Sequence, residues 1–190
     1  MRIGLFGGSF DPPHIGHWLA AVDAFDGLGL DRLDFIPAGR QPLKVSGHAA
    51  TPERRLSMLG AMIGDDPRFA VNAVEITRGG LSFTVDTAAG YRASGPDDEL
   101  FLLLGTDAAS GLARWKEPEQ LLRLVRLVVL TRGSEPFHPA GMSRDALVLA
   151  TRRIDVSSTE VRRRASEGRS LRGFVLDAVA EQIRDAALYR

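Results

Sequence analysis

The sequence predicts an α/β protein with a mainly parallel, doubly wound sheet. Short apolar runs typical of buried strands lie at residues 3–6, 33–36, 99–104 and 127–130. Helix signals separate these runs, and strands that alternate with helices form parallel sheets that are covered on both faces. The alternation continues without a repeat or a linker, so residues 1–190 are expected to form a single domain.

The first strand is expected to lead directly into a ligand-binding turn. Gly7 and Gly8 end the apolar run of residues 3–6, and glycine permits close approach of the backbone to a ligand. A turn rich in proline follows, after which residues 14–28 read as a helix. A strand, a glycine loop and a helix N-terminus place unpaired N–H groups where a phosphate can bind.

Two histidines, His14 and His17, stand three residues apart in the first turn of this helix, so they share one face. Imidazoles beside a phosphate site can donate hydrogen bonds to its oxygens. An isolated H-x-x-H motif is equally compatible with one histidine that caps the helix and one that packs. A zinc site is disfavoured because the chain has no cysteine and no second spaced pair of histidines.

The second strand opens into a loop with a candidate phosphate ligand. Residues 33–36 end at Pro37, and the loop that follows carries Lys44. Ligands bind at the carboxyl edge of open α/β sheets, although a lone lysine is usually a solvated surface residue.

The middle of the chain is expected to contain a helix, a strand and a loop. Thr51 caps the helix, and Arg54 and Arg55 in its first turn are expected to be mainly solvated. Residues 69–76 alternate in the manner of a strand. Residues 78–87 form a glycine loop into the next helix, which by itself reads as a simple connector.

The apolar run at residues 99–104 reads as a central strand, and Gly105 and Asp107 follow it. An acid in this place can bind ribose hydroxyls or anchor the next helix, and the residues alone leave both interpretations open. Trp115 reads first as a core residue, as a lone tryptophan usually is. Arg132 follows the next predicted strand and is a candidate phosphate contact.

The last part of the chain carries a second polar motif. Ser157 or Ser158 can cap a helix, and capping alone is a sufficient explanation of the Ser-Ser-Thr triplet. Arg162 follows one turn later and can grip a phosphate with two N–H groups. His138 lies in a loop that is expected to be exposed, and residues 175–188 read as an amphipathic helix.

The composition is that of an ordinary globular protein. Hydrophobic residues make up 44% of the chain and charged residues 25%, and the formal net charge is zero. This balance gives no sign of binding to nucleic acid or a membrane surface, and no apolar segment is long enough to span a bilayer. The absence of cysteine excludes disulfides and thiolate chemistry and fits a cytoplasmic location. The oligomeric state stays open, a homo-oligomer included.

Two motifs resemble a known family. Residues 8–17 match G-x-F-D-P-x-H-x-G-H, the signature of the nucleotidyltransferase superfamily, which includes the adenylyltransferases of NAD and coenzyme A synthesis. Residues 156–162 resemble its second motif, I-S-[ST]-T-x-[IV]-R, with Val156 in place of isoleucine. The resemblance extends from Gly7 to Arg162 and implies a Rossmann-like fold with helices on both faces of the sheet.

The resemblance implies a nucleotide site at these motifs. Pro37, Pro42 and Lys44 fit a P-x-x-x-x-P-x-K pattern whose lysine helps to hold substrate phosphate in the family. The catalytic residues implied are His14, His17, Lys44 and Arg162. The ATP-binding residues implied are Gly7, Gly8, Ser9, Phe10, His17, Gly105, Asp107, Ser157, Ser158, Thr159 and Arg162.

Further positions resemble the bacterial nicotinate-nucleotide adenylyltransferases within that superfamily. Residues 82–87 match their S-[YF]-T-x-D-T segment, and Trp115 occupies the position of a tryptophan that stacks on nicotinate. Those enzymes hold the nicotinate carboxylate with main-chain N–H groups near the positions of Thr84 and Lys116. The substrate-binding residues expected are Lys44, Phe83, Thr84, Trp115, Lys116 and Arg132.

The resemblance implies transfer of AMP from ATP to nicotinate mononucleotide, which gives nicotinate adenine dinucleotide and pyrophosphate. Mg²⁺ would be bound through the ATP phosphates and not by a protein metal site. No protein nucleophile is required, because the acceptor phosphate is itself a nucleophile. Two alternatives stay open: an adenylyltransferase for nicotinamide mononucleotide or phosphopantetheine, and a nucleotide-binding module without catalysis.

Overall fold

A computed structural model of the chain describes residues 1–42, 47–133 and 146–190. Six strands of these residues form one sheet in the order β3-β2-β1-β4-β5-β6, and every neighbouring pair is parallel. Their bounds are Arg2–Gly8 (β1), Arg32–Pro37 (β2), Phe69–Val71 (β3), Glu99–Gly105 (β4), Arg126–Arg132 (β5) and Leu147–Thr151 (β6). The α/β class and the parallel sheet predicted from the sequence are confirmed.

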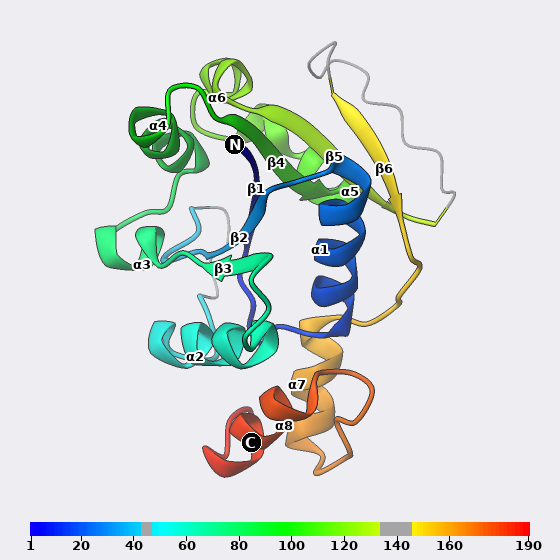
Figure 1. Cartoon of the computed structure of the whole chain (residues 1–190). Coiled ribbons are helices and arrows are strands. Elements are labelled where there is room, and N and C mark those ends of the chain that lie inside the picture. The colour runs from blue at the N-terminus through cyan, green and yellow to red at the C-terminus, as the bar shows by residue number, and fades with distance from the viewer. Residues whose placement is uncertain (43–46, 134–145) are drawn as a thin grey trace.

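Helices cover both faces of this sheet, with α8 beside α2 at the lower side of the view in Figure 1. Buried residues of α1, α2, α7 and α8 belong to one hydrophobic core, and those of α4, α5 and α6 belong to a second core on the opposite face. The helix bounds are Ile15–Leu28 (α1), Pro52–Ile63 (α2), Val74–Arg78 (α3), Thr84–Ser94 (α4), Thr106–Ser110 (α5), Pro118–Leu124 (α6), Ser158–Ser166 (α7) and Asp177–Asp185 (α8), with a 3₁₀ helix at Leu112–Arg114.

Side-chain alternation along β4 accounts for the two cores. Phe101 and Leu103 belong to the first core, and Leu100, Leu102 and Leu104 belong to the second. Successive side chains of a strand leave opposite faces of the sheet, so a strand covered by helices on both sides is apolar at every position. This explains why an unbroken apolar run predicted a central strand.

One predicted strand is shorter than expected. The sequence predicts a strand over residues 69–76, but β3 ends at Val71 and α3 begins at Val74. The Asn72 N–H donates to Phe35 O (2.9 Å), and the Asn72 side-chain oxygen accepts from the Val74 N–H (3.0 Å). An asparagine that bonds the backbone two residues further on forms a turn that competes with the strand. The prediction of one continuous strand is therefore wrong.

The strand order places a switch point between β1 and β4. The chain runs outward from β1 to β2 and β3, then returns to β4 and runs outward on the other side. The carboxyl ends of β1 and β4 thus lie side by side, and open α/β sheets bind ligands in the crevice formed there. Gly8 and Gly105 end these two strands, so the segments that follow them begin at the same edge of the sheet.

Candidate active site

A cavity of about 450 Å³ opens at this switch point. Its walls combine apolar side chains from the sheet with a small number of polar groups, as small-molecule sites do. The cavity brings together seven residues that the sequence predicted for the site: Gly7, Gly8, Phe83, Thr84, Asp107, Trp115 and Lys116.

The turn after β1 is held in one conformation by a buried aromatic ring. Phe10 has a positive φ of 48°, and its ring packs against the rings of Phe6 and Phe35. The same ring lies against Gly8, where a Cβ atom would approach it to 2.9 Å. Position 8 therefore requires glycine, and the backbone there stays open to the cavity.

The two motif histidines bond to each other at the start of α1. His14 is the N-cap residue, and its N–H donates to His17 Nδ1 over 3.2 Å. The two rings stack with centroids 3.7 Å apart, and Gly16 permits this because a Cβ atom there would lie 3.1 Å from the His14 ring. Since Nδ1 of a neutral His17 accepts a hydrogen bond, its proton resides on Nε2. His17 thus takes part in capping and keeps one N–H donor.

Both motif histidines are neutral near pH 7. Burial, and to a smaller extent the charge of Arg132, lowers the pKa of His14 from 6.5 to about 4. Burial also lowers the pKa of His17 well below its ordinary value, with smaller contributions from His14 and Arg132. A neutral imidazole donates its N–H without the cost of a buried charge, and a bound anion would raise both pKa values.

The second motif forms the start of α7 and docks on the first. Ser157 caps the helix with its hydroxyl, as predicted. Ser158 Oγ donates to Pro12 O (2.8 Å), and Arg162 Nη1 donates to Asp11 O (2.7 Å). Two segments that lie far apart in the sequence are therefore joined directly by hydrogen bonds.

The cavity has a wall formed by the start of α4 and the segment after the 3₁₀ helix. Phe83 is the N-cap residue of α4, so the N–H groups of Thr84 and Val85 precede the first intrahelical bond. Lys116 Nζ pairs with Asp86 (2.9 Å) and lies 4.9 Å from the centre of the Phe83 ring. A positive helix end beside an aromatic ring suits a planar ligand with a negative charge.

Glu75 is a buried acid of the cavity that the sequence motifs did not indicate. It lies in α3, is 7% exposed, and accepts a hydrogen bond from the Thr87 hydroxyl (2.9 Å). Burial raises the pKa of this carboxyl, and hydrogen bonds from Thr87 and Ser82 oppose the rise. Thr87 and Ser82 belong to the S-F-T-V-D-T segment, so part of the role of that segment is to hold this acid.

Arg55 is a second residue that sequence reasoning missed. It is fully buried, and its Nη1 donates to Ser9 O (2.9 Å), so the prediction that it is solvated is wrong. The buried residues of α2 include Met58, Leu59 and Met62. Arg55 lies three and four residues before the first two of these, so helical periodicity places it on the same buried face.

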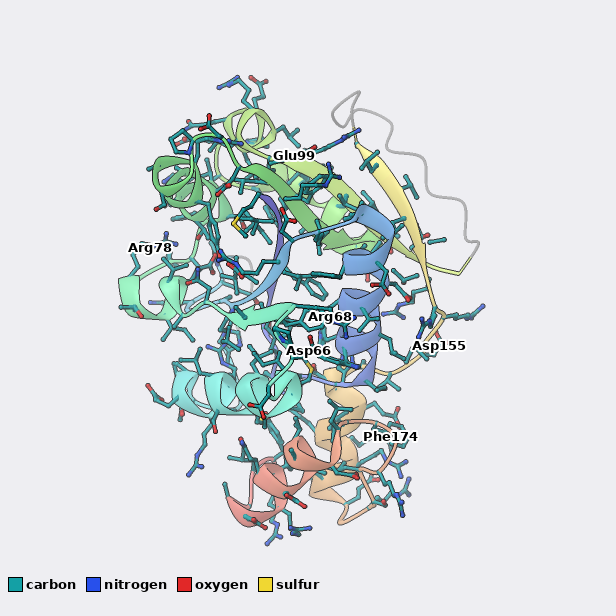
Figure 2. All side chains as sticks on the ribbon, in the orientation of Figure 1. Asp66, Arg68, Arg78, Glu99, Asp155 and Phe174 are labelled. Carbon is teal, nitrogen blue, oxygen red and sulfur yellow. The ribbon has the colours of Figure 1, made fainter. Side chains whose placement is uncertain are left out.

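Arg132 and Thr159 are among the predicted residues that do not line the cavity. Arg132, at the end of β5, is exposed and lies 3.9 Å from Asp155, which Figure 2 labels on the segment between β6 and α7. The charge of Arg132 acts on both motif histidines, which places it on their side of the site. Thr159 lies in the second motif, where its hydroxyl accepts from Arg162 Nη2 (3.2 Å).

The described residues contain no group of three His, Cys, Asp or Glu side chains that could hold a metal ion. Lys44 and His138 lie outside the described residues. In the part of the chain that the structure describes, no helix has the length and apolar character needed to cross a membrane.

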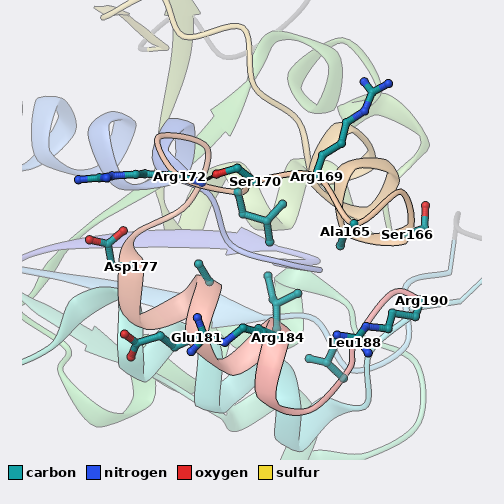
Figure 3. A pocket seen from close by; sticks show the side chains of 14 residues that line it. Ala165, Ser166, Arg169, Ser170, Arg172, Asp177, Glu181, Arg184, Leu188 and Arg190 are labelled. Atoms are coloured by element: carbon teal, nitrogen blue, oxygen red, sulfur yellow. Dashed lines mark hydrogen bonds between the residues drawn. The ribbon is translucent and has the colours of Figure 1, made fainter.

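A second cavity, of about 690 Å³, lies between α7, the segment after it and α8 (Figure 3). Two arginines on its wall have acidic partners: Arg169 with Glu167 (3.1 Å) and Arg184 with Asp185 (3.0 Å). Figure 3 shows Arg169 pointing outward, away from the hollow. No residue predicted for the site lines this cavity. The switch-point cavity is therefore the candidate active site.

Comparison with known proteins identifies the class: the chain belongs to the cytidylyltransferase-like family, whose model matches residues 5–164. A relative from Gemmatimonas aurantiaca, named a probable nicotinate-nucleotide adenylyltransferase, is 50% identical, and the match covers 100% of this chain and 93% of the relative. A relative of the same name from Thermus thermophilus is 45% identical, with 100% of both chains covered. The resemblance predicted from the motifs is confirmed.

A solved structure with this fold is Plasmodium falciparum nicotinic acid mononucleotide adenylyltransferase complexed with NaAD. It superposes with a TM-score of 0.81 over 99% of this chain and 97% of that chain, at 16% sequence identity. This likeness confirms the Rossmann-like fold that the motifs implied.

Proposed function

We propose that this protein is an enzyme that transfers AMP from ATP to nicotinate mononucleotide, giving nicotinate adenine dinucleotide and pyrophosphate in NAD biosynthesis. One observation carries the proposal: the stacked histidines and Arg162 lie at the sheet edge where a cavity contains Trp115 and the start of α4. The names of the full-length relatives support nicotinate mononucleotide as the acceptor.

Two parts of the site take different tasks in this reaction. We call residues 9–17 and 157–162 the phosphate end, and residues 82–86 and 115–116 the acceptor end. ATP would lie with its phosphates at the phosphate end and its adenosine near Gly105 and Asp107. Nicotinate mononucleotide would place its ring at the acceptor end.

At the phosphate end, His17 Nε2–H, Arg162 and the main-chain N–H groups around Gly8 would donate to phosphate oxygens. An oxygen of the acceptor phosphate forms a bond to the α-phosphorus of ATP as the bond to pyrophosphate breaks. Negative charge moves toward the leaving pyrophosphate, so donors that are already in place stabilise the transition state. The acceptor attacks directly, and no covalent protein intermediate is needed.

Mg²⁺ would be held by the ATP phosphates, since the described residues form no protein cage for it. When bound, the ion would neutralise part of the phosphate charge. We also propose a cytoplasmic location, which a chain without cysteine fits.

The acceptor end favours an acid over an amide. A carboxylate only accepts hydrogen bonds, so it suits the N–H groups of Thr84 and Val85 at the start of α4. A carboxamide would turn its NH₂ toward one of these donors and leave it unpaired, at a cost of about 1–3 kcal/mol. Trp115 supplies an aromatic face for the pyridine ring in the same cavity.

Pyrophosphate release with ATP and each acceptor in turn tests the proposal: nicotinate mononucleotide, nicotinamide mononucleotide and phosphopantetheine. We expect kcat/KM for nicotinate mononucleotide to exceed that for the amide by about tenfold or more. Equal values would refute selectivity for the acid and leave AMP transfer intact. ATP binding without pyrophosphate release from any acceptor would favour a non-catalytic nucleotide-binding module.

A further inference from the structure

Asp11 is buried in the turn after β1 and joins that turn to two other segments. It is 1% exposed, and its carboxylate accepts hydrogen bonds from the N–H groups of Ala49 (2.6 Å) and Ala50 (3.0 Å) and from the Tyr189 hydroxyl (2.8 Å). A buried polar group needs hydrogen-bond partners, and these donors satisfy both oxygens of Asp11. These three donors therefore define where Asp11 lies.

Tyr189 lies in the segment after α8, 178 residues from Asp11 in the sequence. Its φ is 66° and that of Ala187 is 50°, in a region that residues with side chains rarely occupy. Such a backbone persists only where tertiary contacts hold it, and the bond to Asp11 is one of these contacts. Burial, followed by the hydrogen bond to Asp11, raises the pKa of the Tyr189 hydroxyl, which therefore stays a donor at neutral pH.

Other groups of the phosphate end attach to the backbone around Asp11. The main-chain carbonyls of residues 9, 11 and 12 accept hydrogen bonds from Arg55, Arg162 and Ser158, at 2.9, 2.7 and 2.8 Å. A displacement of Asp11 would therefore displace Arg162 as well. A misplacement of about 1 Å in a catalytic arrangement can cost about 100-fold in rate.

Arg55 adds a buried positive charge next to the same turn. Its Nε and Nη2 atoms have no hydrogen-bond partner among the residues that the structure describes. Burial lowers the pKa of Arg55, and the negative charge of Asp11 opposes this. A buried cation needs an anion close by, so Asp11 balances the charge of Arg55 in addition to joining the turn to Tyr189.

We propose that Tyr189 is a positioning residue of the phosphate end. Its hydroxyl holds Asp11, and through Asp11 it sets where Arg162 and the turn of residues 9–12 meet the phosphates of ATP. Tyr189 itself does not touch the reacting atoms. The inference rests on the proposed function as far as ATP binding is concerned, and it is independent of the acceptor.

Tyr91 provides a control, because its hydroxyl also donates to a buried aspartate, at a place away from the motifs. Its hydroxyl donates to Asp34 over 2.5 Å, and Asp34 is 2% exposed. Asp34 lies in β2 and pairs with Arg32, and neither belongs to the phosphate end. Removal of either tyrosine hydroxyl deletes one hydrogen bond to a buried carboxylate. The Tyr91 hydroxyl also accepts from Asn72 Nδ2 (2.7 Å), so Tyr91→Phe should lose at least as much stability as Tyr189→Phe.

The experiment compares Tyr189→Phe with Tyr91→Phe in the full chain. Calorimetric titration with a non-hydrolysable ATP analogue measures affinity without an acceptor, and steady-state kinetics measures kcat and both KM values. We expect Tyr189→Phe to weaken the analogue about tenfold and to change KM for nicotinate mononucleotide less than about twofold. Tyr91→Phe should lower Tm by at least as much as Tyr189→Phe and leave the affinity for the analogue unchanged.

Unchanged affinity for the analogue in folded Tyr189→Phe, or an equal loss in both variants, would overturn the inference. If Tyr189→Phe does not fold in plain buffer, the titration is repeated for both variants in sucrose, which favours the folded state, and Tyr189→Phe should show the same defect there. A wild-type protein that binds the analogue but does not adenylate nicotinate mononucleotide would refute the proposed function, and the affinities would still decide the role of Tyr189. No binding of the analogue by the wild type would overturn both.

Discussion

The two ends of the site differ in how firmly the protein holds them before a ligand binds. At the phosphate end, α2, α7 and the segment after α8 all bond to the turn of residues 9–12. At the acceptor end, Ser82 bonds to the backbone of residues 39 and 40. Residues 115–116 are joined to α4 by a pair between Lys116 and Asp86, and both side chains are more than one third exposed. An exposed pair of this kind contributes little to rigidity.

This difference suggests a division of tasks. The phosphate end supplies donors that need not move. Such donors stabilise best the charge that shifts during transfer of AMP. Recognition of a ring requires an aromatic face and a few main-chain donors, which the acceptor end supplies. Substitutions at the phosphate end should therefore act on the rate and on ATP binding, and substitutions at the acceptor end should act mainly on acceptor binding.

The largest effect is expected for His17→Ala. Loss of one preorganised donor typically lowers kcat by about 100-fold or more, and we expect ATP affinity to change much less. Measurement of kcat at saturating substrates, together with calorimetric ATP affinity, separates the two quantities. A kcat near the wild-type value would exclude His17 from catalysis and remove the contrast between the two ends.

Arg162→Lys should lower kcat/KM for ATP by more than about tenfold, because lysine cannot reproduce the planar pair of donors. Arg163→Lys is the matched control in the same helix. Arg163 is exposed and pairs with Glu160 and Glu167, so this variant should keep wild-type kinetics. Full activity of Arg162→Lys would show that Arg162 contributes only its positive charge and that its planar pair of donors is not required.

Trp115→Ala should raise KM for nicotinate and nicotinamide mononucleotide alike, by about tenfold, since stacking on an aromatic ring is worth about 1–3 kcal/mol. The value of kcat should change little. Thr84→Ala is the control at the same wall of the cavity, because it keeps the main-chain N–H that we propose for the carboxylate. A fall in kcat at unchanged KM would contradict the separation of tasks.

The smallest effect is expected in the pH dependence of stability. The pKa of His14 is about 4 in the folded protein and 6.5 as a model value, so the unfolded chain takes up the proton first as the pH falls. Stability from this group is present above pH 6.5 and is lost as the pH falls toward 4. Between pH 7 and about pH 5.5, the free energy of unfolding should decrease by about 1 kcal/mol.

Chemical denaturation of the wild type and of His14→Gln at both pH values measures this difference, because glutamine does not titrate. The decrease in the free energy of unfolding between the two pH values should be smaller in His14→Gln. The pH dependence that remains in the variant includes the contribution of His17, whose pKa is also lowered. Identical pH slopes in the two proteins would show that burial of His14 does not affect its protonation, contrary to its place at the phosphate end.

The sequence by itself determined the fold class, the carboxyl edge of the sheet as the place for a ligand, and a helix that begins at Ser157 or Ser158. These features depend on local patterns: unbroken apolar runs such as residues 99–104, glycines that end β1, and a serine that satisfies the first N–H groups of a helix. The motif histidines were also visible, since their spacing places them on one helical face. Local patterns sufficed because each of these features involves residues within a few positions of one another.

The tertiary structure alone decided which remote side chains support the turn of residues 9–12. Tyr189 and Asp11 are 178 residues apart and meet only when α8 packs beside α2. The sequence predicted a solvated Arg55, but the packing of α2 buries the helix face that carries it. The sequence also placed Glu75 in a strand, but the turn at Asn72 ends that strand and places Glu75 in α3. In each case, packing of the whole chain brings the partner close. A local pattern of residues does not predict contacts between segments that lie far apart in the sequence.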